Sequence, residues 1–375
     1  MNTLIKIRIA MAVLIVLFAS QLSCKKKDNF SNKLYISEAK NSPLAVLTMD
    51  NGVGTMSLTA AMVYKTAEAV QTTFSILDSS YVKEFNRKNH TEFQSVPSSA
   101  ITLSTTQANI GSNQVFSNPV TLSVKSWPGY IGGVQYVVPV KISEGSNGMG
   151  LVPGSDVVYI RVKQVAVSKA VLNGAFGVPE GGPLMGPAAL GKPFNTVTIE
   201  GRIKYDNYFI VSGNWRSDVF YGYGCQIISS SDGSMNVRFP NAAFIGAVGK
   251  QNLKTWTHFA LVIENSNVSF YINGDLMVQS PYPGLTEEGA YSLSGYAAGC
   301  GLNVDEFRVW RTARTRNQLK EYACEVNPKD PDLLAYWKFD DGSGTRVTDV
   351  SGHGHNLVSN ASATPTWVPG VRCPE

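Results

Sequence analysis

Two neighbouring stretches decide the fold of the second half of the chain. They are NVDEFRVWRTARTRNQL at residues 303–319 and LLAYWKFDDGSGTRVTDVSGHGHNL at residues 333–357. In the first, Val304, Phe307 and Val309 alternate with polar residues, which is typical of a half-buried β-strand. The second begins with an aromatic run and continues into segments rich in glycine, serine and aspartate, which are typical of turns. Both patterns predict an all-β domain.

Upstream of these stretches lie two further strand signals. The segment TVTIEGRI at residues 196–203 alternates, and LKTWTHFALVIENSNVSFYINGDL at 253–276 places Asn273-Gly274 between apolar runs, which is the strongest short signal for a hairpin. Together these segments resemble the laminin-G-like, concanavalin-A-like jelly-roll family over roughly residues 190–373. Its W-x-H and Y-x-N-G pattern matches Trp256, His258, Tyr271, Asn273 and Gly274. The resemblance implies a sandwich of two sheets, with a structural role for His258.

The first half contains short apolar or alternating runs separated by Gly, Ser, Asn and Pro clusters, which predicts a second β-sandwich. The exception is residues 78–88, where Asp78 is a candidate N-cap and Tyr81, Val82 and Phe85 form an apolar stripe, so we expect a helix. The predicted strands are 46–49, 57–63, 70–76, 101–103, 120–124, 136–142 and 157–162.

The order of these elements also resembles a known domain. From ILDSSYVKEFNRKNHTEFQSVP at residues 76–97 to VVYIRVK at 157–163, it is similar to the N-terminal domain of unknown function found on Bacteroidetes lipoproteins related to endo-β-N-acetylglucosaminidases. The resemblance covers roughly residues 34–163. It implies an immunoglobulin-like spacer between a lipid anchor and a carbohydrate-active module.

The first residues predict the compartment. Lys6 and Arg8 precede an apolar run at residues 9–19, which is too short for a stable membrane span and has the length of a signal-peptide core. A small residue and Cys24 follow, as in bacterial lipoprotein signals, although Gln21 departs from the commonest pattern. We therefore expect a signal peptide at 1–23, a lipidated Cys24 and a polar tether at 24–33. The alternative is an ordinary cleaved signal with an incidental cysteine.

Composition divides the rest of the chain. We expect an immunoglobulin-like domain at residues 34–165, a Gly/Pro-rich linker at 166–193 and the concanavalin-like domain at 194–375. The formal net charge is +4, and loss of Lys6 and Arg8 with the signal leaves about +2. No basic stripe appears, so the sequence argues against a nucleic-acid partner.

Four cysteines remain after Cys24, and all lie in the second half: Cys225, Cys300, Cys324 and Cys373. In an oxidising compartment two disulfides are expected, and four cysteines allow three pairings. We favour Cys324–Cys373, because Cys373 closes the chain after the last strand, and then Cys225–Cys300. Zinc is a poor alternative, because no C-x-x-C motif occurs.

The carboxylates do not form a recognisable glycosidase motif. Glycosidases need two carboxylates that flank the substrate, and on a single strand this requires alternate positions. Asp305 and Glu306 are adjacent, so we expect them to point to opposite faces of their strand. Asp340 and Asp341 are adjacent in a turn. The sequence thus predicts a protein that is not an enzyme, and an atypical pair assembled across strands is the alternative.

A structural calcium ion is a further expectation. Asp349 and Asn356 lie in a turn that offers several oxygens, and Ca²⁺ prefers six to eight oxygen ligands. The concanavalin-like resemblance would add Asp305. The alternative is that Asp349 and Asn356 stabilise the turn through its own backbone.

Glycan contacts require aromatic platforms beside polar side chains. The densest such cluster comprises Trp215, Arg216, Asp218, Tyr221 and Tyr223, and Tyr282 is a further candidate. The plain alternative is that these aromatic residues belong to the core, as we expect for Trp310 and Trp337. We expect Arg311, Arg314 and Arg316 to form a solvated face beside a short helix that begins near Thr315.

These features predict a lipid-anchored outer-membrane protein that binds glycans without cleaving them. The resemblance implies a polysaccharide-utilisation system, in which such proteins work beside an outer-membrane importer and glycosidases, with N-glycans or polysaccharides as ligands. Two alternatives stay open: a glycoside hydrolase with an atypical carboxylate pair, and a laminin-G-type adhesion or scaffold protein with a protein partner. The face of the membrane on which the protein lies also stays open.

Overall fold

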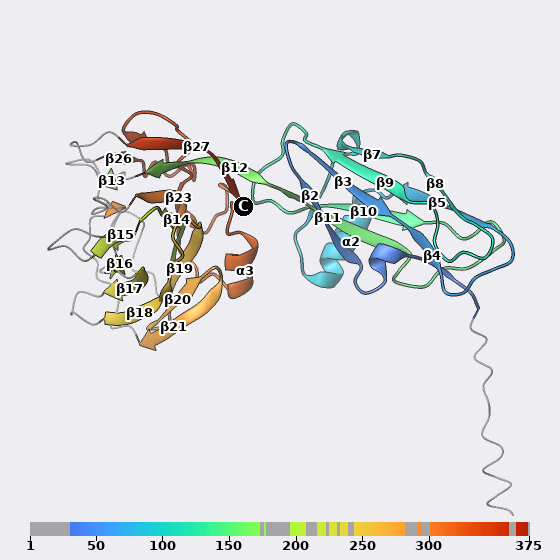
Figure 1. The fold of residues 1–375 in the computed structure, drawn as a ribbon, viewed down its shortest axis with the longest axis horizontal. Helices are drawn as coiled ribbons and strands as arrows, with labels where there is room; N and C mark the ends of the chain where they lie inside the picture. The colour runs from blue at the N-terminus through green and yellow to red at the C-terminus, as the bar shows by residue number, and fades with distance from the viewer. Residues whose placement is uncertain are drawn as a thin grey trace, which may run out of the picture.

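The protein consists of two β-sandwich domains that lie end to end (Figure 1). In this computed structural model, residues 31–172, 176–177, 196–207, 216–222, 225–230, 233–238, 244–281, 292–293, 301–359 and 365–373 are described. The predicted signal and most of the tether lie outside these ranges. Among the described residues, no helix is long and apolar enough to cross a membrane.

The N-terminal domain contains a large sheet with the strand order β2-β11-β10-β5-β8, to which β6 adds beside β10. Two small sheets, β3-β9-β7 and β1-β4, complete the sandwich. The strands are β1 (Leu34–Ile36), β2 (Leu44–Met49), β3 (Val53–Leu58), β4 (Ala60–Met62), β5 (Val70–Ile76), β6 (Gln94–Ser95), β7 (Ile101–Leu103), β8 (Gln107–Ile110), β9 (Val120–Lys125), β10 (Tyr136–Ile142) and β11 (Val157–Gln164). Every predicted strand overlaps one of these, although the predicted run 57–63 is split between β3 and β4.

Helix α2 (Ser79–Asn89) covers the outer face of the large sheet and confirms the helix predicted from the sequence. Asp78 is its N-cap and accepts a hydrogen bond from the backbone of Ser80 at 2.7 Å, which satisfies a free N–H group of the first turn. Val82 and Phe85 are buried against Val137 of β10. The predicted apolar stripe therefore faces the sheet.

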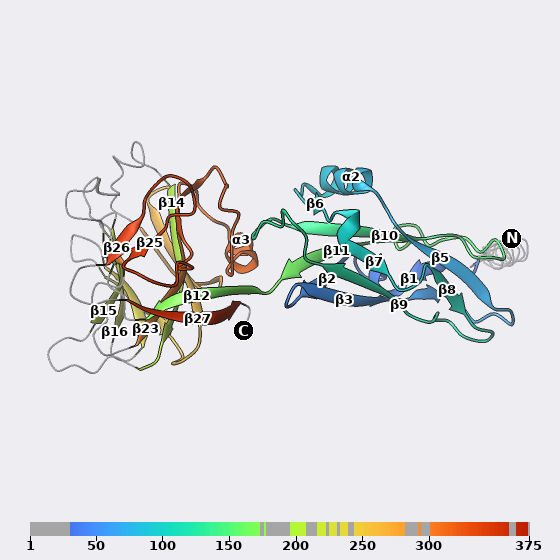
Figure 2. The ribbon, with the colours of Figure 1, turned by 90° about the horizontal axis from the view of Figure 1, so that it is seen from above.

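The C-terminal domain packs two eight-stranded sheets face to face. The junction sheet is the one nearer the N-terminal domain (Figures 1 and 2), with the order β21-β20-β19-β14-β23-β12-β27 and β24 beside β23. Its strands are β12 (Ala166–Leu172), β14 (Thr196–Tyr205), β19 (Thr257–Glu264), β20 (Asn267–Ile272), β21 (Asp275–Pro281), β23 (Leu302–Trp310), β24 (Leu333–Trp337) and β27 (Thr366–Cys373).

The distal sheet lies on the far side of this domain, in the order β18-β17-β16-β15-β22-β13-β26-β25 (Figure 1). Its strands are β13 (Phe176–Gly177), β15 (Arg216–Gly222), β16 (Cys225–Ser230), β17 (Ser234–Arg238), β18 (Phe244–Lys250), β22 (Ser292–Leu293), β25 (Arg346–Val347) and β26 (Leu357–Ser359). The all-β sandwich predicted for this half is confirmed. An apolar core that includes Ile199, Phe259, Phe307 and Trp337 fills the space between the sheets.

The predicted hairpin joins β20 to β21. Asn273 and Gly274 both have positive φ angles, 50° and 73°, as the tight turns of hairpins require. A side chain at Gly274 would also collide with Lys320 of helix α3 (Arg316–Glu321), because its Cβ would lie 2.2 Å from Lys320 Cγ. Glycine is thus needed here both for its backbone angle and for the close approach of α3.

The prediction of a linker from residue 166 is wrong. Residues 166–172 form β12, which pairs with both β27 and β23 inside the junction sheet. Only Val165 separates β12 from β11 of the N-terminal domain, so one nearly continuous strand crosses between the domains (Figure 2). The error arose because the Gly/Pro-rich composition begins only after β12, and most of that segment lies outside the described residues.

Candidate functional site

The outward face of the junction sheet carries ionisable side chains that are almost completely buried. They come from the neighbouring strands β14, β19 and β23. Residues 311–332, which include α3, cover the part of the layer around Arg308, whereas Asp305 contacts Ser168 of β12 and Arg202 lies against the ring of Trp256. Arg308 fixes this cover, because its guanidinium donates to the backbone oxygens of Tyr322 at 2.7 Å and Ala323 at 2.9 Å. The buried charged layer comprises Glu200, Arg202, His258, Asp305, Glu306 and Arg308, each no more than 4% exposed.

Glu200 is the centre of this layer. Its carboxylate accepts a hydrogen bond from Trp310 Nε1 at 2.7 Å, contacts His258 Nε2 at 3.0 Å and lies 3.8 Å from Arg308. Burial alone would raise the pKa of Glu200, but the charge of Arg308 and the bond to His258 lower it to about 2. Burial lowers the pKa of His258. The pair is therefore an ionised carboxylate held by a neutral imidazole, in agreement with the structural role expected for His258.

Asp305 and Glu306 lie on the same face of β23, so the prediction that they point to opposite faces is wrong. Val304 and Phe307, on either side of them, both belong to the core between the sheets. The register against β14 shifts at this point, and Glu306 has a positive φ of 51°. This is a β-bulge, which turns two consecutive side chains outward. Alternation along a strand cannot reveal such an insertion from sequence.

Each of these two carboxylates has its own partners. Asp305 forms an ion pair with Arg202 at 2.9 Å and accepts a hydrogen bond from Ser168 at 3.0 Å. Glu306 accepts a hydrogen bond from the hydroxyl of Tyr336. Burial raises the pKa of Asp305 to about 7 and that of Glu306 to about 8. Since the two residues are 0% and 1% exposed, neither carboxylate is open to a sugar in this conformation.

Arg314 also lies inside this region rather than on the solvated face that the sequence predicted. It is only 7% exposed, and its guanidinium lies 4.1 Å from the centroid of the Trp310 ring. Stacking of this kind compensates part of the loss of water around a buried cation. The short helix near Thr315 is confirmed, with Thr315 and Gln318 forming a capping box at its start.

The predicted glycan-binding residues belong to the distal sheet. Arg216, Asp218 and Tyr221 lie on β15, between β16 and β22, on the side of the domain that faces away from the N-terminal domain (Figure 1). Trp215, Tyr223 and Tyr282 lie outside the described residues. Ligand contact by this group stays a prediction.

The predicted calcium ligands have other partners in the structure. Asp349 accepts hydrogen bonds from the backbones of Tyr336, Ser351 and His355 at 2.9–3.0 Å, and the side-chain oxygen of Asn356 accepts one from the backbone of Asp349. Asp305 is paired with Arg202. The oxygens of Asp349 and Asn356 thus stabilise their own turn, and the calcium site stays a prediction. Within the described ranges, no cluster of three His, Cys, Asp or Glu residues is arranged to hold a metal ion.

Cys324 and Cys373 form a disulfide, which is the pairing favoured from the sequence. It ties the end of β27 to the segment that covers the buried charged layer. Cys225 begins β16, and Cys300 lies outside the described residues, so the second predicted disulfide stays a prediction. Cys24 lies outside them as well.

A polar hollow opens beside this cover, on the same outward face of the junction sheet. Its volume is about 310 Å³. Its rim carries the exposed side chains of Asn265, Asn267 and Gln279, whereas Ser269 and Arg314 are buried in its floor. Tyr271 adds a partly buried aromatic ring. Amides, a hydroxyl, a guanidinium and an aromatic ring are the groups that recognise the hydroxyls and C–H faces of a sugar.

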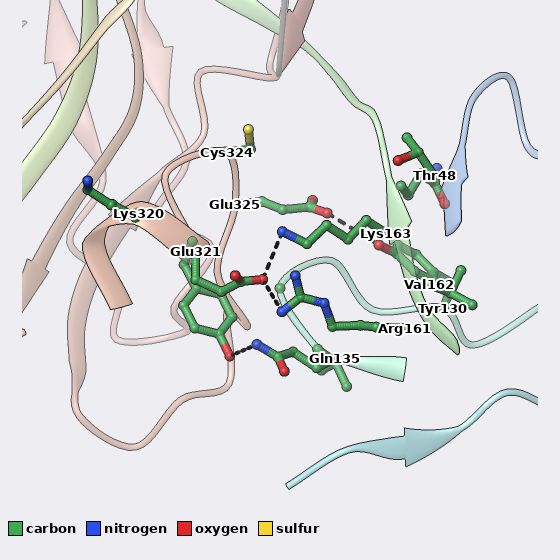
Figure 3. Close-up of a pocket in the computed structure, with 14 residues that line it drawn as sticks. Thr48, Tyr130, Gln135, Arg161, Val162, Lys163, Lys320, Glu321, Cys324 and Glu325 are labelled. Atoms are coloured by element: carbon green, nitrogen blue, oxygen red, sulfur yellow. Dashed lines mark hydrogen bonds and ion pairs between the residues drawn. The ribbon is translucent and has the colours of Figure 1, made fainter. Parts of the chain in front are cut away.

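A second cavity, of about 260 Å³, lies between the two domains (Figure 3). Arg161 and Lys163 of β11 both reach Glu321 of α3, at 2.8 and 3.0 Å. Gln135 donates to the hydroxyl of Tyr322 at 2.7 Å. Arg161 and Lys163 of one domain and Glu321 of the other therefore form ion pairs across the junction, which suits a contact that fixes the domains.

The comparison with protein families decides the identity of the second domain. Residues 193–320 match the family model described as the concanavalin A-like lectin/glucanases superfamily. The C-terminal domain belongs to this superfamily. Residues 30–149 match the model of an N-terminal domain family, in the region where the sequence resembled such a domain. The concanavalin A-like match ends inside α3, so β24 to β27 are assigned to this domain by the pairing of its sheets.

Among solved structures, a candidate carbohydrate-binding protein from Bacteroides ovatus shares this two-domain fold. It is 21% identical, the alignment covers 90% of this chain and 97% of that one, and the TM-score is 0.58. EndoBT-3987 from Bacteroides thetaiotamicron, solved with its Man5GlcNAc product, is 19% identical over 35% of this chain and 30% of that one, with a TM-score of 0.30. That score is too low to transfer its fold to this chain. None of the curated proteins compared with the chain is significantly similar to it.

Sequence reasoning missed the buried charged layer and the polar hollow. The alternation in residues 196–203 marks one polar face of the concanavalin A-like β14, but it does not reveal that residues 311–332 cover that face. The hollow combines three strands with residues 313–315, which are distant in sequence. A usable signal was the even spacing of Asn267, Ser269 and Tyr271, which places three polar or aromatic side chains on one face of a strand.

Proposed function

We propose that this protein is a lipid-anchored, non-catalytic glycan-binding protein. The concanavalin A-like domain supports this function, because that superfamily comprises lectins as well as glucanases. The similarly folded protein from Bacteroides ovatus is described as a candidate carbohydrate-binding protein. Fold alone does not determine a ligand, so the proposal also depends on the chemistry of the outward faces of this domain.

The observation that supports binding most directly is the polar hollow beside α3. Its size is close to the lower end for small-molecule sites, about 300 Å³. Its lining includes three exposed amides and the exposed carboxylate of Glu264, with a buried serine and a buried arginine. Such a lining suits sugar hydroxyls, each of which donates and accepts hydrogen bonds. We propose the hollow as one glycan site and the predicted cluster around Trp215 on the distal sheet as a second.

Binding is favoured over hydrolysis by the burial of the carboxylates in the charged layer. A glycosidase needs two carboxyl groups that flank a bound sugar. Glu200, Asp305 and Glu306 are fully enclosed and paired with Arg308, Arg202 and Tyr336 respectively. Their arrangement fits a structural layer.

The setting of the protein is part of the proposal. Lipidation of Cys24 would attach the chain to the outer membrane, and the resemblance of the N-terminal domain supports a role beside an importer and glycosidases of a polysaccharide-utilisation system. Polysaccharides or N-glycans are the proposed ligands. A structural calcium ion at Asp349 and Asn356 is a separate part of the proposal.

A glycan array with the mature chain, from Cys24 onward, tests this function, with calcium and with a chelator. We expect the native protein to bind at least one glycan reproducibly. Loss of binding in Trp215→Ala would identify the distal-sheet cluster as the site, and loss of binding in the double variant Asn267→Ala with Gln279→Ala would identify the polar hollow. Gln71→Ala, an exposed amide of the N-terminal domain, is the control and should bind like the native protein. A requirement for calcium would support the calcium site.

Two outcomes would contradict the proposal. Absence of binding to every glycan, with the fold intact by circular dichroism, would favour the adhesion alternative and a protein partner. Release of a shortened glycan by the native protein would make it a hydrolase. Loss of that release in Glu306→Gln would then assign the activity to the charged layer.

A further inference from the structure

Three large apolar side chains are exposed at one end of the N-terminal domain. Val63, Tyr64 and Phe116 are 45%, 52% and 52% exposed. They lie on the loops that follow β4 and β8. We call these three residues the tip. Exposed apolar groups that gather in one place on a soluble domain mark a surface for contact with another molecule or with a membrane.

The loops of the tip are held together by the backbone. Met62 donates to the oxygen of Val115 at 2.9 Å, and Ala61 forms a β-bridge with Phe116. Further along, Ser112 donates to the oxygen of Ala67 at 2.6 Å. The exposure of the tip is therefore set by an ordered structure.

The tip lies at the end of the molecule opposite the C-terminal domain. β5 begins and β8 ends beside it, since Val70 pairs with Ile110, and both strands lie at that end of the molecule in Figure 2. The first described residues are attached to the same place. Asn32 and Tyr64 exchange two hydrogen bonds, from Asn32 Nδ2 to the oxygen of Tyr64 at 2.7 Å and from Tyr64 N to Asn32 Oδ1 at 2.9 Å.

The chain that precedes the tip is short. Cys24 lies eight residues before Asn32, and a fully extended chain of that length spans at most about 28 Å. If Cys24 carries a lipid, the tip cannot move farther than this from the bilayer surface. In the sequence, residues 25–33 contain four lysines, Lys25, Lys26, Lys27 and Lys33, against one acidic residue, Asp28, and the loop 63–69 contains Lys65 and Glu68. This balance suits anionic headgroups.

We propose that the tip is a second membrane contact, which places Tyr64 and Phe116 in the interface of the bilayer beside the lipid on Cys24. Tyr64 suits this interface because its ring is apolar and its hydroxyl can reach water. Phe116 would contribute a purely apolar ring at the boundary between headgroups and acyl chains. The contact orients the protein, so that the C-terminal domain and its glycan sites project away from the membrane. This inference rests on the lipid anchor of the proposed function, and it does not require that the ligand be a glycan.

Depth-dependent quenching tests the contact. The lipidated full chain is placed in vesicles of phosphatidylethanolamine and phosphatidylglycerol that contain a brominated lipid, which quenches tryptophan inside the bilayer. We expect Phe116→Trp to add a strongly quenched signal to that of the native protein. Leu276→Trp, an equally exposed apolar position at 49% on β21 of the other domain, should add an unquenched one. No extra quenching of Phe116→Trp, or equal quenching of both, would overturn the proposal.

A second measurement follows transfer of the lipidated protein between vesicles. The pair Tyr64→Ser and Phe116→Ser should speed transfer roughly tenfold, because two rings no longer lie in the interface, whereas Leu276→Ser with Met277→Ser should not change it. An unchanged rate for the tip variant would refute the contact. If light scattering without lipid shows that the tip variant loses an oligomer of the native protein, the tip binds a second copy instead.

The lipid anchor and glycan binding are checked separately. Cys24→Ser should abolish flotation with vesicles, and if it does not, the anchor itself is wrong and the proposal falls with it. Glycan binding by the tip variants should equal that of the native protein. If the tip variants lose glycan binding while Phe116→Trp is quenched as expected, the membrane contact is supported. Such a result would contradict only the expectation that the tip and the glycan sites act independently.

Discussion

The two domains are both β-sandwiches, but they bury different kinds of side chain. Among the described residues of the N-terminal domain, the buried polar side chains are hydroxyls, those of Thr72 and Ser117. The junction sheet of the C-terminal domain buries three carboxylates, two arginines and a histidine in its charged layer. Among the described residues, the N-terminal sandwich thus buries apolar groups and two hydroxyls, whereas the C-terminal sandwich also buries ion pairs.

This difference shows where the domains are sensitive to change. An apolar core loses stability in proportion to the volume removed. A buried ion pair contributes little net stability, but removal of one partner leaves a charge that can be neither solvated nor paired. The C-terminal domain should therefore tolerate single charge changes far less well than the N-terminal domain does.

The largest expected effect comes from Arg308→Met. The change leaves Glu200 without its cation and the backbone oxygens of Tyr322 and Ala323 without a donor, so we expect a loss of about 3–5 kcal/mol in the free energy of unfolding of the C-terminal domain. Urea unfolding followed by tryptophan fluorescence measures this loss. Five of the six tryptophans lie in the C-terminal domain and only Trp127 lies in the N-terminal one, so the signal reports mainly the unfolding of the C-terminal domain.

The control for Arg308→Met is Lys141→Met in the N-terminal domain. Lys141 lies 3.7 Å from Asp156 at the surface, and its side chain is 36% exposed. Such pairs contribute no more than about 1 kcal/mol. Equal losses in both variants would contradict the comparison between the domains.

A smaller effect is expected from pH. The pKa of Glu306 is raised to about 8 by burial, so the folded state retains a proton that the unfolded state releases above about 4.5. Protonated Glu306 therefore contributes its full stability below its pKa in the unfolded state. This contribution is lost as the pH rises from there through its pKa in the folded state. Between pH 6.5 and 8.5 the C-terminal domain should lose roughly 1–2 kcal/mol.

Glu306→Gln isolates this contribution. An amide cannot ionise, so the slope of stability against pH above 6.5 should become shallower in the variant, and the slope that remains up to about pH 7 should come from Asp305, whose pKa is also raised. His258 does not contribute there, because its lowered pKa keeps it neutral in the folded state and it is largely neutral in the unfolded state as well. An unchanged slope would show that Glu306 ionises freely, and hence that the layer admits water.

The smallest effect concerns the connection between the domains. Glu321→Gln weakens the contacts with Arg161 and Lys163, whose side chains are 16% and 40% exposed. We expect the free energy of interaction between the two domains to fall by about 1 kcal/mol. Calorimetry should show this as a wider separation between the unfolding temperatures of the two domains. Each domain should remain folded.

Glu84→Gln is the matched control for Glu321→Gln. Glu84 also pairs with one arginine and one lysine, Arg87 and Lys88, but within the surface of α2. It should leave the separation of the midpoints unchanged. A similar shift in both variants would show that the junction contacts do not couple the domains.

Local patterns predicted the elements that local physics controls. Asp78 marked the start of α2, because a capping carboxylate needs only the backbone of the first turn. Asn273-Gly274 marked the hairpin, because positive φ angles at two successive residues are rare outside tight turns. The period of apolar residues predicted most strands of both domains, and the position of Cys373 after the last strand indicated its pairing with Cys324.

The errors have one physical cause. The strand β12 in the predicted linker, the outward turn of both Asp305 and Glu306, and the burial of Arg314 all depend on contacts between segments far apart in the chain. β12 is stabilised by β27, about 200 residues later. Arg314 is covered because residues 311–332 fold back over the junction sheet. The sequence by itself determined the β class of both domains, their helices and their hairpin, since the pattern of each element follows from neighbouring residues. Only the tertiary structure decided which polar face is buried, which hollow stays open and how the domains join, because those depend on which surfaces meet.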